Sequence, residues 1–322
     1  MESFETIQSL IEQNDYMVSI DLKEAYHSIK LHSSSRKFTA FHFAHKRYCF
    51  NVLPFGLSSA PRIFSKVLKV VVNHLDDLIL VSNSLYPIKI QLEYCVNLLK
   101  SLGFTVNMEK SSLIPNKKLL HLGYVWDSSA MTVSIPESKI ISSRIQSNTI
   151  LTTQCSIRSL ASLLGFLISH RKAFPYAPIH YRGMQNCLLK NLESKSWDQI
   201  LCLDSHAIKD LSWWKNCPDN LPSYSLVHKV AEYSLTTDSS LFAWGAVLES
   251  SSGDRISECS GVWSKNESEF HINFLELKGI FNGIKAFSSI LFGKNISIYS
   301  DNKTAIYYMS KMGGTRSFLM CS

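Results

Sequence analysis

Two adjacent aspartates, Asp76 and Asp77, stand directly before an apolar run at residues 78–81. The run has the composition of a buried strand, and carboxylates beside buried structure are costly unless a positive group compensates them. Asn73 and His74 are turn-compatible, so one interpretation is a plain turn. The other is a hairpin whose tip presents carboxylates to Mg²⁺, a hard cation that prefers oxygen ligands. A third carboxylate on another strand would favour the metal site.

Asp21 is the candidate for that third carboxylate. Residues 16–20 read as a strand and Asp21 stands at its carboxyl end, where open α/β sheets place their ligand sites. An N-cap for the following helix would explain this aspartate equally well. Between the two acidic sites, residues 53–61 (LPFGLSSAP) combine small residues with prolines, which restrict the backbone. One interpretation is a segment whose backbone lies close to a flat ligand. The other is a plain loop that leads into a helix.

In this order, the segments resemble the palm of reverse transcriptases. Residues 21–26 (DLKEAY) resemble the first metal-binding motif, and residues 53–61 resemble the LPFGLxxAP motif. Residues 74–77 (HLDD) resemble the YxDD box, with His in place of the usual aromatic. Residues 103–110 (GFTVNMEK) are similar to the motif that carries a leaving-group lysine, and residues 121–125 (HLGYV) to the primer grip. The retrotransposon type matches best, with the long-terminal-repeat and DIRS-like lineages nearest.

The resemblance implies a role for each matching residue. Asp21 and Asp76 would hold two Mg²⁺ ions about 3.5–4 Å apart, with Mn²⁺ as the alternative ion, and Asp77 would support them from beside the site. The other implied roles are nucleotide and template contact by Tyr26, Pro54, Phe55 and Gly56, protonation of the pyrophosphate by Lys110, and the primer grip by Leu122, Gly123 and Tyr124. The implied partners are an RNA or DNA template–primer and deoxynucleoside triphosphates.

A second set of acids lies near the other end of the chain. Asp238 follows strand-like residues, Glu276 lies in a predicted helix at residues 273–287, and Asp301 follows a further predicted strand. Each acid alone would suit a solvated or capping role. Strand with Asp, hairpins, helix with Glu and strand with Asp is nevertheless the layout of a ribonuclease H, which this region resembles in its retrotransposon form. The resemblance implies that all three acids bind Mg²⁺ and act on an RNA–DNA hybrid.

The predicted fold class is α+β, in three parts. Residues 1–136 are assigned to a right-hand polymerase palm with partial fingers, residues 137–230 to a helical thumb or connection, and residues 231–322 to an incomplete ribonuclease H-like domain. Basic minus acidic residues give +3, +5 and −1 for these parts. A basic middle suits a nucleic-acid duplex that lies across both sites, since phosphate neutralisation dominates such affinity. A solvated helical face is the alternative.

Composition indicates a globular protein. The chain has 322 residues, 45% of them hydrophobic, and its mean hydropathy is +0.01. No apolar run reaches the ~18 residues of a membrane span, and no signal peptide precedes the first motif. We therefore expect an intracellular protein of the cytoplasm or nucleus. The eight cysteines show no paired metal spacing and are expected to be reduced, buried thiols.

Three departures from the family pattern predict a chain truncated at both ends. Asp21 lies 20 residues from the start, so upstream fingers are missing, and only 12 residues separate Pro61 from His74. The chain ends 21 residues after Asp301, before a fourth ribonuclease H acid. We therefore expect slow or absent primer extension and poor RNA cleavage. An active polymerase with ribonuclease H, a catalytically inactive nucleic-acid-binding relic and an unstable fragment stay open.

Overall fold

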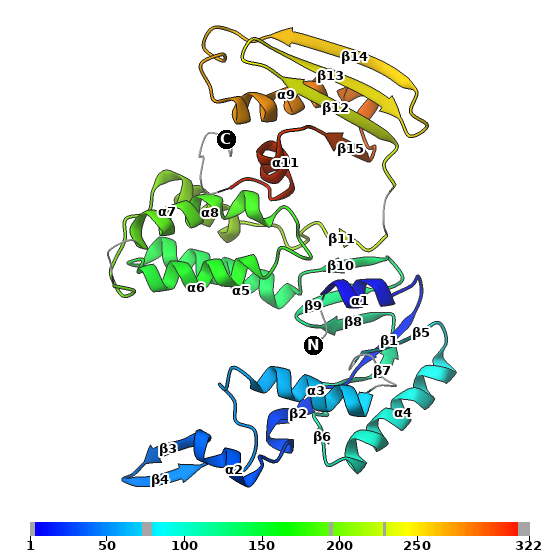
Figure 1. Cartoon of the computed structure of the whole chain (residues 1–322), viewed down its shortest axis with the longest axis vertical. Helices are drawn as coiled ribbons and strands as arrows, with labels where there is room; N and C mark the ends of the chain where they lie inside the picture. The colour runs from blue at the N-terminus through cyan, green and yellow to red at the C-terminus, as the bar shows by residue number, and fades with distance from the viewer. Residues whose placement is uncertain (1–3, 73–78, 193–195, 228–229, 315–322) are drawn as a thin grey trace. The chain divides into compact units, whose positions relative to one another are not determined.

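The computed structural model describes residues 4–72, 79–192, 196–227 and 230–314 (Figure 1). The chain divides into two compact units, Met1–Pro136 and Glu137–Ser322. Within the described ranges, no helix is both long enough and apolar enough to cross a membrane.

The first unit mixes short strands with two long helices. Its helices are α1 (Phe4–Leu10), α2 (Ser33–Arg36), α3 (Ala60–Val72), α4 (Leu85–Ser101) and the 3₁₀ turns η1 (Ala25–Ser28) and η2 (Lys37–Thr39). Its strands are β1 (Tyr16–Ser19), β2 (Leu22–Lys23), β3 (Ala40–Phe43), β4 (Lys46–Cys49), β5 (Ile79–Ser82), β6 (Thr105–Val106), β7 (Ser112–Asn116), β8 (Lys118–His121), β9 (Tyr124–Asp127) and β10 (Thr132–Ser134).

An antiparallel sheet of β5, β1 and β7 forms the base of this unit, with β1 in the centre. Its central strand is apolar, and Val18, which pairs with Leu80, is fully buried. The long helix α4 packs against β1 and β5, and its Ile88 and Leu99 join the same core. Burial of these side chains, at about 1.5–3 kcal/mol each, holds the carboxyl end of β1 in place before Asp21.

The second unit begins with helices and ends with a sheet. Its helices are α5 (Glu137–Thr152), α6 (Ile157–Ile168), α7 (Arg182–Leu192), α8 (Ser205–Lys215), α9 (Ile272–Ala286), α10 (Ser288–Leu291), α11 (Lys303–Ser310) and the 3₁₀ turn η3 (Ala177–His180). Its strands are β11 (Tyr224–Ser225), β12 (Tyr233–Ser239), β13 (Ala243–Ser250), β14 (Arg255–Val262) and β15 (Ile296–Tyr299).

Helices α5 to α8 pack on one another around leucines at helical spacing in α6. Trp214 of α8 is fully buried, and its indole Nε1 donates to the His180 carbonyl at 2.7 Å. Asp210 of α8 accepts the backbone N–H of Met184 at 3.1 Å, so it satisfies a free donor at the start of α7. Burial raises the pKa of Asp210 to about 6.

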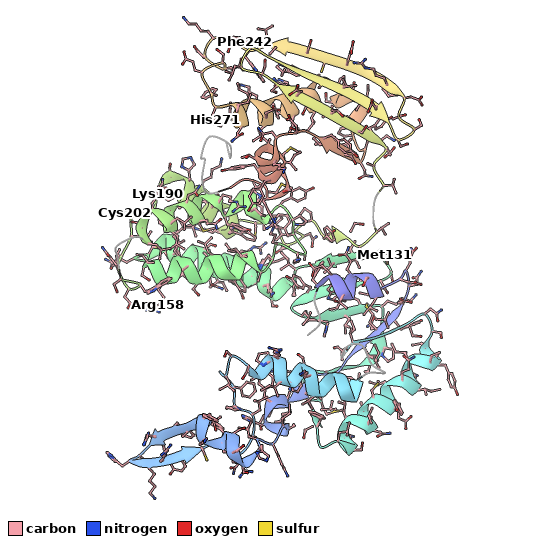
Figure 2. All side chains as sticks on the ribbon, in the orientation of Figure 1. Met131, Arg158, Lys190, Cys202, Phe242 and His271 are labelled. Carbon is pink, nitrogen blue, oxygen red and sulfur yellow. The ribbon has the colours of Figure 1, made fainter. Side chains whose placement is uncertain are left out.

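The sheet of the second unit has the order β14-β13-β12-β15. Strands β14, β13 and β12 are antiparallel, whereas β15 runs parallel to β12 and pairs Tyr299 with Thr236. Helix α9 lies against β12 and β13 (Figure 1). His271, labelled in Figure 2, caps this helix: its Nδ1 accepts the backbone N–H of Asn273 at 3.2 Å.

The thiols differ from the sequence expectation in their exposure. Seven of the eight cysteines are described and all seven are free. Four of them are buried, but Cys49 and Cys202 are exposed and Cys259 is half-buried. The prediction of uniformly buried thiols is therefore wrong for these three. Cys49 lies on the β3–β4 hairpin, which has no core of its own.

Candidate active sites

The structure brings Asp238, Glu276 and Asp301 together in the second unit. One carboxylate oxygen from each lies within 4.8 Å of the others. Asp238 and Asp301 are exposed, whereas Glu276 is 4% exposed. One carboxylate of the cluster is therefore buried and two are exposed, so solvent can reach the cluster from the side of the two aspartates.

Strand pairing explains why the two aspartates meet. Thr236 of β12 pairs with Tyr299 of the parallel strand β15. Asp238 and Asp301 each stand two residues farther along, at the same edge of the sheet. Parallel neighbours end together, so residues distant in sequence reach one edge, as at other ligand sites of α/β sheets.

Two glycines on α9 bring Glu276 to this edge. A Cβ at Gly279 would lie 2.4 Å from Ser239 Oγ, and a Cβ at Gly283 would lie 2.9 Å from Ala246 Cβ. Only glycine permits this approach of the helix to β12 and β13. Ser239 Oγ also donates to the Leu275 carbonyl at 3.3 Å, which ties the strand to the helical turn that carries Glu276.

Electrostatics at Glu276 disfavour its charged form. Burial first, and then the charges of Asp238 and Asp301, raise its pKa to about 7, against a backbone hydrogen bond from Ser239. Its Oε2 atom is buried and has no hydrogen-bond partner. A buried carboxylate oxygen without a partner beside two more carboxylates is suited to a hard divalent cation, which would supply the missing positive charge. The residues present therefore fit Mg²⁺.

Two asparagines that are not among the predicted site residues, Asn302 and Asn273, support this cluster. Asn302 follows Asp301, and its Oδ1 accepts the backbone N–H groups of Thr304 and Ala305 at 3.0 Å each, which caps α11. Its Nδ2 donates to Oδ1 of Asn273 on α9, also at 3.0 Å. The N-cap preference for Asn was a visible signal for the first contact. No sequence pattern predicts the hydrogen bond between Asn302 and Asn273.

In the first unit, Asp21 is held by residues of the Gly103–Lys110 segment and its neighbour. Asn107 Nδ2 donates to the Asp21 carboxylate at 3.0 Å, and the Asp21 carbonyl accepts the Asn107 N–H at 2.7 Å. The backbone N–H of Asp21 donates to Ser111 Oγ at 2.9 Å. Lys110 lies in the same turn, where its N–H donates to Asn107 Oδ1 at 3.4 Å. The structure thus brings the turn of Lys110 to Asp21, and it adds Asn107 and Ser111, whose contacts with Asp21 no sequence pattern predicts.

Tyr26 and Phe55, which were predicted to contact nucleotide and template, lie together. Their ring centroids are 4.9 Å apart, and Phe64 meets Tyr26 edge-on at 5.2 Å. Phe55 is 60% exposed, so the pair presents an open aromatic surface. Pro54 is buried, and Gly56 has φ +85°, a left-handed conformation that glycine adopts without strain.

The predicted primer-grip residues form the tight turn between β8 and β9. Leu122 and Gly123 have φ values of 49° and 77°, as a two-residue hairpin turn of type I′ requires. Leucine in this conformation is strained by roughly 1–2 kcal/mol. Tyr124 begins β9 and contacts the ring of Phe4, and burial raises its pKa, with a further contribution from the charge of Glu5.

Asp76 and Asp77 lie outside the described residues, as does His74 before them. Their distance from Asp21 therefore stays a prediction. Strand β5 begins at Ile79, two residues after Asp77, and pairs antiparallel with β1, the strand before Asp21.

Comparison with known protein families matches both regions. A family model described as reverse transcriptase (RNA-dependent DNA polymerase) matches residues 2–126. A model described as the RNase H-like domain found in reverse transcriptase matches residues 230–319. The resemblance inferred from the motifs is therefore confirmed for both parts and for their order.

Curated relatives are polyproteins of viruses and transposons. The genome polyprotein of petunia vein clearing virus is 26% identical over 307 residues, covering 92% of this chain and 13% of its own length. The Pol polyproteins of the Drosophila melanogaster transposons opus and 297 are 25% and 28% identical, covering 94% and 89% of this chain. This chain spans 31% and 27% of those two proteins.

Solved structures of similar fold include the foamy viral protease–reverse transcriptase. Its complex with an RNA/DNA hybrid has a TM-score of 0.57 at 14% identity, covering 94% of this chain and 43% of its own. Its complex with double-stranded DNA has a TM-score of 0.58 at 14% identity, covering 96% and 64%. The likeness confirms the predicted fold class, a polymerase palm with an RNase H-like domain. Residues 2–126 thus match the reverse transcriptase family, and residues 230–319 match the RNase H-like domain found in reverse transcriptases.

Proposed function

We propose that this chain is the RNA-directed DNA polymerase and ribonuclease H part of a mobile-element polyprotein. The cluster of Asp238, Glu276 and Asp301 is the observation that supports the proposal most directly. The proposed partners are an RNA or DNA template–primer, an RNA–DNA hybrid and deoxynucleoside triphosphates. The proposed cofactor is Mg²⁺, two ions at each site, with Mn²⁺ as the alternative. Residues 1–136, 137–230 and 231–322 are assigned to palm with partial fingers, thumb or connection, and ribonuclease H.

In the ribonuclease H reaction, a water oxygen bonds to a phosphorus of the RNA strand while the bond from that phosphorus to the ribose 3′-oxygen breaks. A bound divalent cation supplies charge neutralisation for the phosphate and lowers the pKa of the attacking water. Asp238 and Asp301 would hold it from the open side and Glu276 from the buried side. Because the pKa of Glu276 is about 7, its proton competes with the cation, and Mg²⁺ affinity rises as the pH increases through 7.

In the polymerase reaction, the primer 3′-oxygen bonds to the α-phosphorus of a deoxynucleotide as pyrophosphate leaves. Asp21 and Asp76 would hold the metal ions, with Asp77 beside them, and Asn107 orients the Asp21 carboxylate. Lys110 would give its proton to the departing pyrophosphate. Tyr26 and Phe55 would form the surface against which the nucleotide and template base lie, as their open aromatic pair allows. Leu122, Gly123 and Tyr124 would hold the primer.

Two assays on the full chain test the proposal. The first follows Mg²⁺-dependent cleavage of labelled RNA in an RNA–DNA hybrid, and the second follows deoxynucleotide incorporation on an RNA template. Glu276→Gln should reduce cleavage by at least about 100-fold without affecting incorporation, whereas Asp21→Asn should do the reverse. Glu269→Gln, an exposed glutamate in the same unit, is the matched control and should change neither rate.

The wild-type chain also decides between the remaining alternatives. Binding of the hybrid with neither activity, in Mg²⁺ and in Mn²⁺, would identify a catalytically inactive nucleic-acid-binding relic. Unfolding without a cooperative transition would identify an unstable fragment.

A further inference from the structure

An arginine from a different helix binds the carboxyl end of α11. Arg182, the first residue of α7, donates from Nη2 to the Lys311 carbonyl at 2.9 Å and to the Gly313 carbonyl at 3.2 Å. Its Nη1 atom donates to Gln185 Oε1 at 2.7 Å, which fixes the plane of the guanidinium. The guanidinium therefore links the start of α7 to the end of α11.

The chain after α11 turns back in a conformation that leaves these carbonyls available. Met312 and Gly313 have φ values of 52° and 99°, and the Gly313 N–H donates to the Tyr308 carbonyl at 2.8 Å. A left-handed residue followed by such a backbone bond commonly ends a helix. The last carbonyls of a helix carry partial negative charge and lack partners within it. A guanidinium at the Lys311 carbonyl is therefore favourable.

Arg182 is held in place by the packing of α7 on α8. Asp210 of α8 accepts the Met184 N–H at 3.1 Å, and a Cβ at Gly183 would lie 2.6 Å from the His206 carbonyl oxygen. The Nε atom of Arg182 is buried and has no hydrogen-bond partner among the described residues. A buried donor without a partner is unfavourable, so the charge-assisted bonds from Nη1 and Nη2 must hold the guanidinium there.

Helix α11 connects this contact to the acidic cluster. It has eight residues, so it is about 12 Å long and can move as one rigid body. It begins two residues after Asp301, and at that end Asn302 caps it and binds Asn273 of α9. Because α11 also packs against α9, the contacts at its two ends set its tilt on that surface.

We propose that Arg182 is a positioning residue for the cluster of Asp238, Glu276 and Asp301, and that it acts through α11. Without Arg182, the carboxyl end of the helix is released and the helix tilts about its amino end, which displaces Asp301. The proposal rests on the proposed function only for what the cluster does. The placement of Asp301 itself can be measured without metal or nucleic acid.

Amide hydrogen exchange of the full chain in EDTA distinguishes a positioning residue from a local cap. Arg182→Ala should raise the exchange rate of the Lys311 and Gly313 amides, in the last turn, by roughly tenfold or more. A local cap would protect only that turn. A positioning residue also protects the Thr304 and Ala305 amides, which bond to Asn302 beside Asp301, so their exchange should rise as well.

Two further variants complete the exchange experiment. Arg144→Ala is the matched control, because Arg144 donates to the Cys217 carbonyl at 3.0 Å and to Asp219 at 2.7 Å, all within residues 137–230. It should leave the exchange of α11 at the wild-type rate. Arg182→Lys keeps the charge but lacks the planar fork, so it should restore part of the protection.

Calorimetric titration with Mn²⁺ measures the consequence for the cluster. Affinity should fall about threefold to tenfold in Arg182→Ala and stay unchanged in Arg144→Ala. In the cleavage assay, Arg182→Ala should lower kcat more than it raises KM, because a positioning residue acts on the reacting groups and not on uniform binding of the hybrid.

Three results would each overturn the proposal: faster exchange confined to the last turn of α11, unchanged exchange at both of its ends, or wild-type Mn²⁺ affinity in Arg182→Ala. Failure of the proposed function has a different signature. If the wild-type chain bound no cation while exchange still rose at both ends, the proposed function would be wrong and the placement of Asp301 by Arg182 would stand.

Discussion

Asn302 Nδ2 lies 3.0 Å from Asn273 Oδ1, so the side chain that caps α11 also links that helix to α9. The orientation of the Asn302 amide is fixed, because its Oδ1 already accepts two backbone N–H groups and only Nδ2 can face Asn273. Asn302 follows Asp301, and Asn273 lies one helical turn before Glu276. The hydrogen bond therefore sets the spacing of two of the three clustered acids.

Asn302→Ser should weaken Mg²⁺ or Mn²⁺ binding to the second unit while preserving its thermal stability. Serine is also a favourable N-cap, but it is too short to reach Asn273. Loss of one hydrogen bond of about 1 kcal/mol corresponds to roughly fivefold weaker binding, measured by titration calorimetry. Asn266→Ser, at an exposed position, is the control. Adding Asn273→Ala to Asn302→Ser should cause no further loss, and an additive loss would show that the two side chains act independently.

Glu276→Gln should stabilise the metal-free chain above pH 7. The pKa of Glu276 is about 7 in the folded chain against an ordinary value of 4.5, so the folded state binds the proton more tightly. That contribution to stability is present below pH 4.5 and lost as the pH rises through 7. Glutamine carries no charge, so the variant should gain on the order of 1–3 kcal/mol relative to wild type above pH 7.

Urea denaturation in EDTA across this pH range checks the Glu276 prediction. Mg²⁺ should reverse the order of stability, because only the wild type retains the full set of ligands. An equal free energy of unfolding for both proteins at high pH would show that the buried carboxylate is not strained by its neighbours.

Gly279→Ala should displace α9 from β12 and weaken cation binding. The new Cβ would lie 2.4 Å from Ser239 Oγ, so either this hydroxyl turns away and loses its hydrogen bond to the Leu275 carbonyl, or the helix shifts. Overpacking of this kind costs about 1–3 kcal/mol. In contrast, Gly165→Ala on α6 meets no atom within 4 Å and should stabilise the chain by about 0.5–1 kcal/mol. Combining Gly279→Ala with Ser239→Ala should recover part of the lost metal affinity; no recovery would exclude this contact as the cause.

His170→Phe should remove a sensitivity to acid in the helical part of the second unit. His170 is fully buried, and burial lowers its pKa to about 4, with a smaller effect from the charge of Lys139. Its contribution to stability is therefore present above pH 6.5 and lost as the pH falls towards 4. The wild type should lose on the order of 1–3 kcal/mol relative to the variant over that interval, measured by denaturation at each pH. Parallel pH profiles for the two proteins would contradict this.

The order of acids and elements could be predicted from the sequence because each lies in a local pattern. Asp238, Glu276 and Asp301 each follow or lie within a recognisable strand or helix, and the fold class was inferred from their order. The link between Asn302 and Asn273 could not be predicted, because it joins side chains 29 residues apart that share no periodicity. The same holds for Asn107, which reaches Asp21 across 86 residues.

A charge sum over a long part of the chain can hide a strongly basic stretch within it. Residues 1–136 sum to only +3 because acids elsewhere in that part offset the acid-free segment at residues 25–75. The sums therefore draw attention to residues 137–230, whose contact with a nucleic-acid duplex stays a prediction, and away from residues 25–75. The register of the β3–β4 hairpin places Phe41, Phe43 and Tyr48 on one face of the two strands. A count of charges along the sequence cannot show this arrangement.

The parallel pairing of β12 with β15 makes cation binding a test of correct folding. Side chains alternate between the faces of a sheet, so a one-residue slip of β15 would turn Asp301 away from Asp238 and Glu276. A compact chain with the wrong register would contain all three acids and yet bind no Mg²⁺ at this edge. During refolding from denaturant, the appearance of a tight cation site should therefore coincide with native strand order, later than collapse and the recovery of helix.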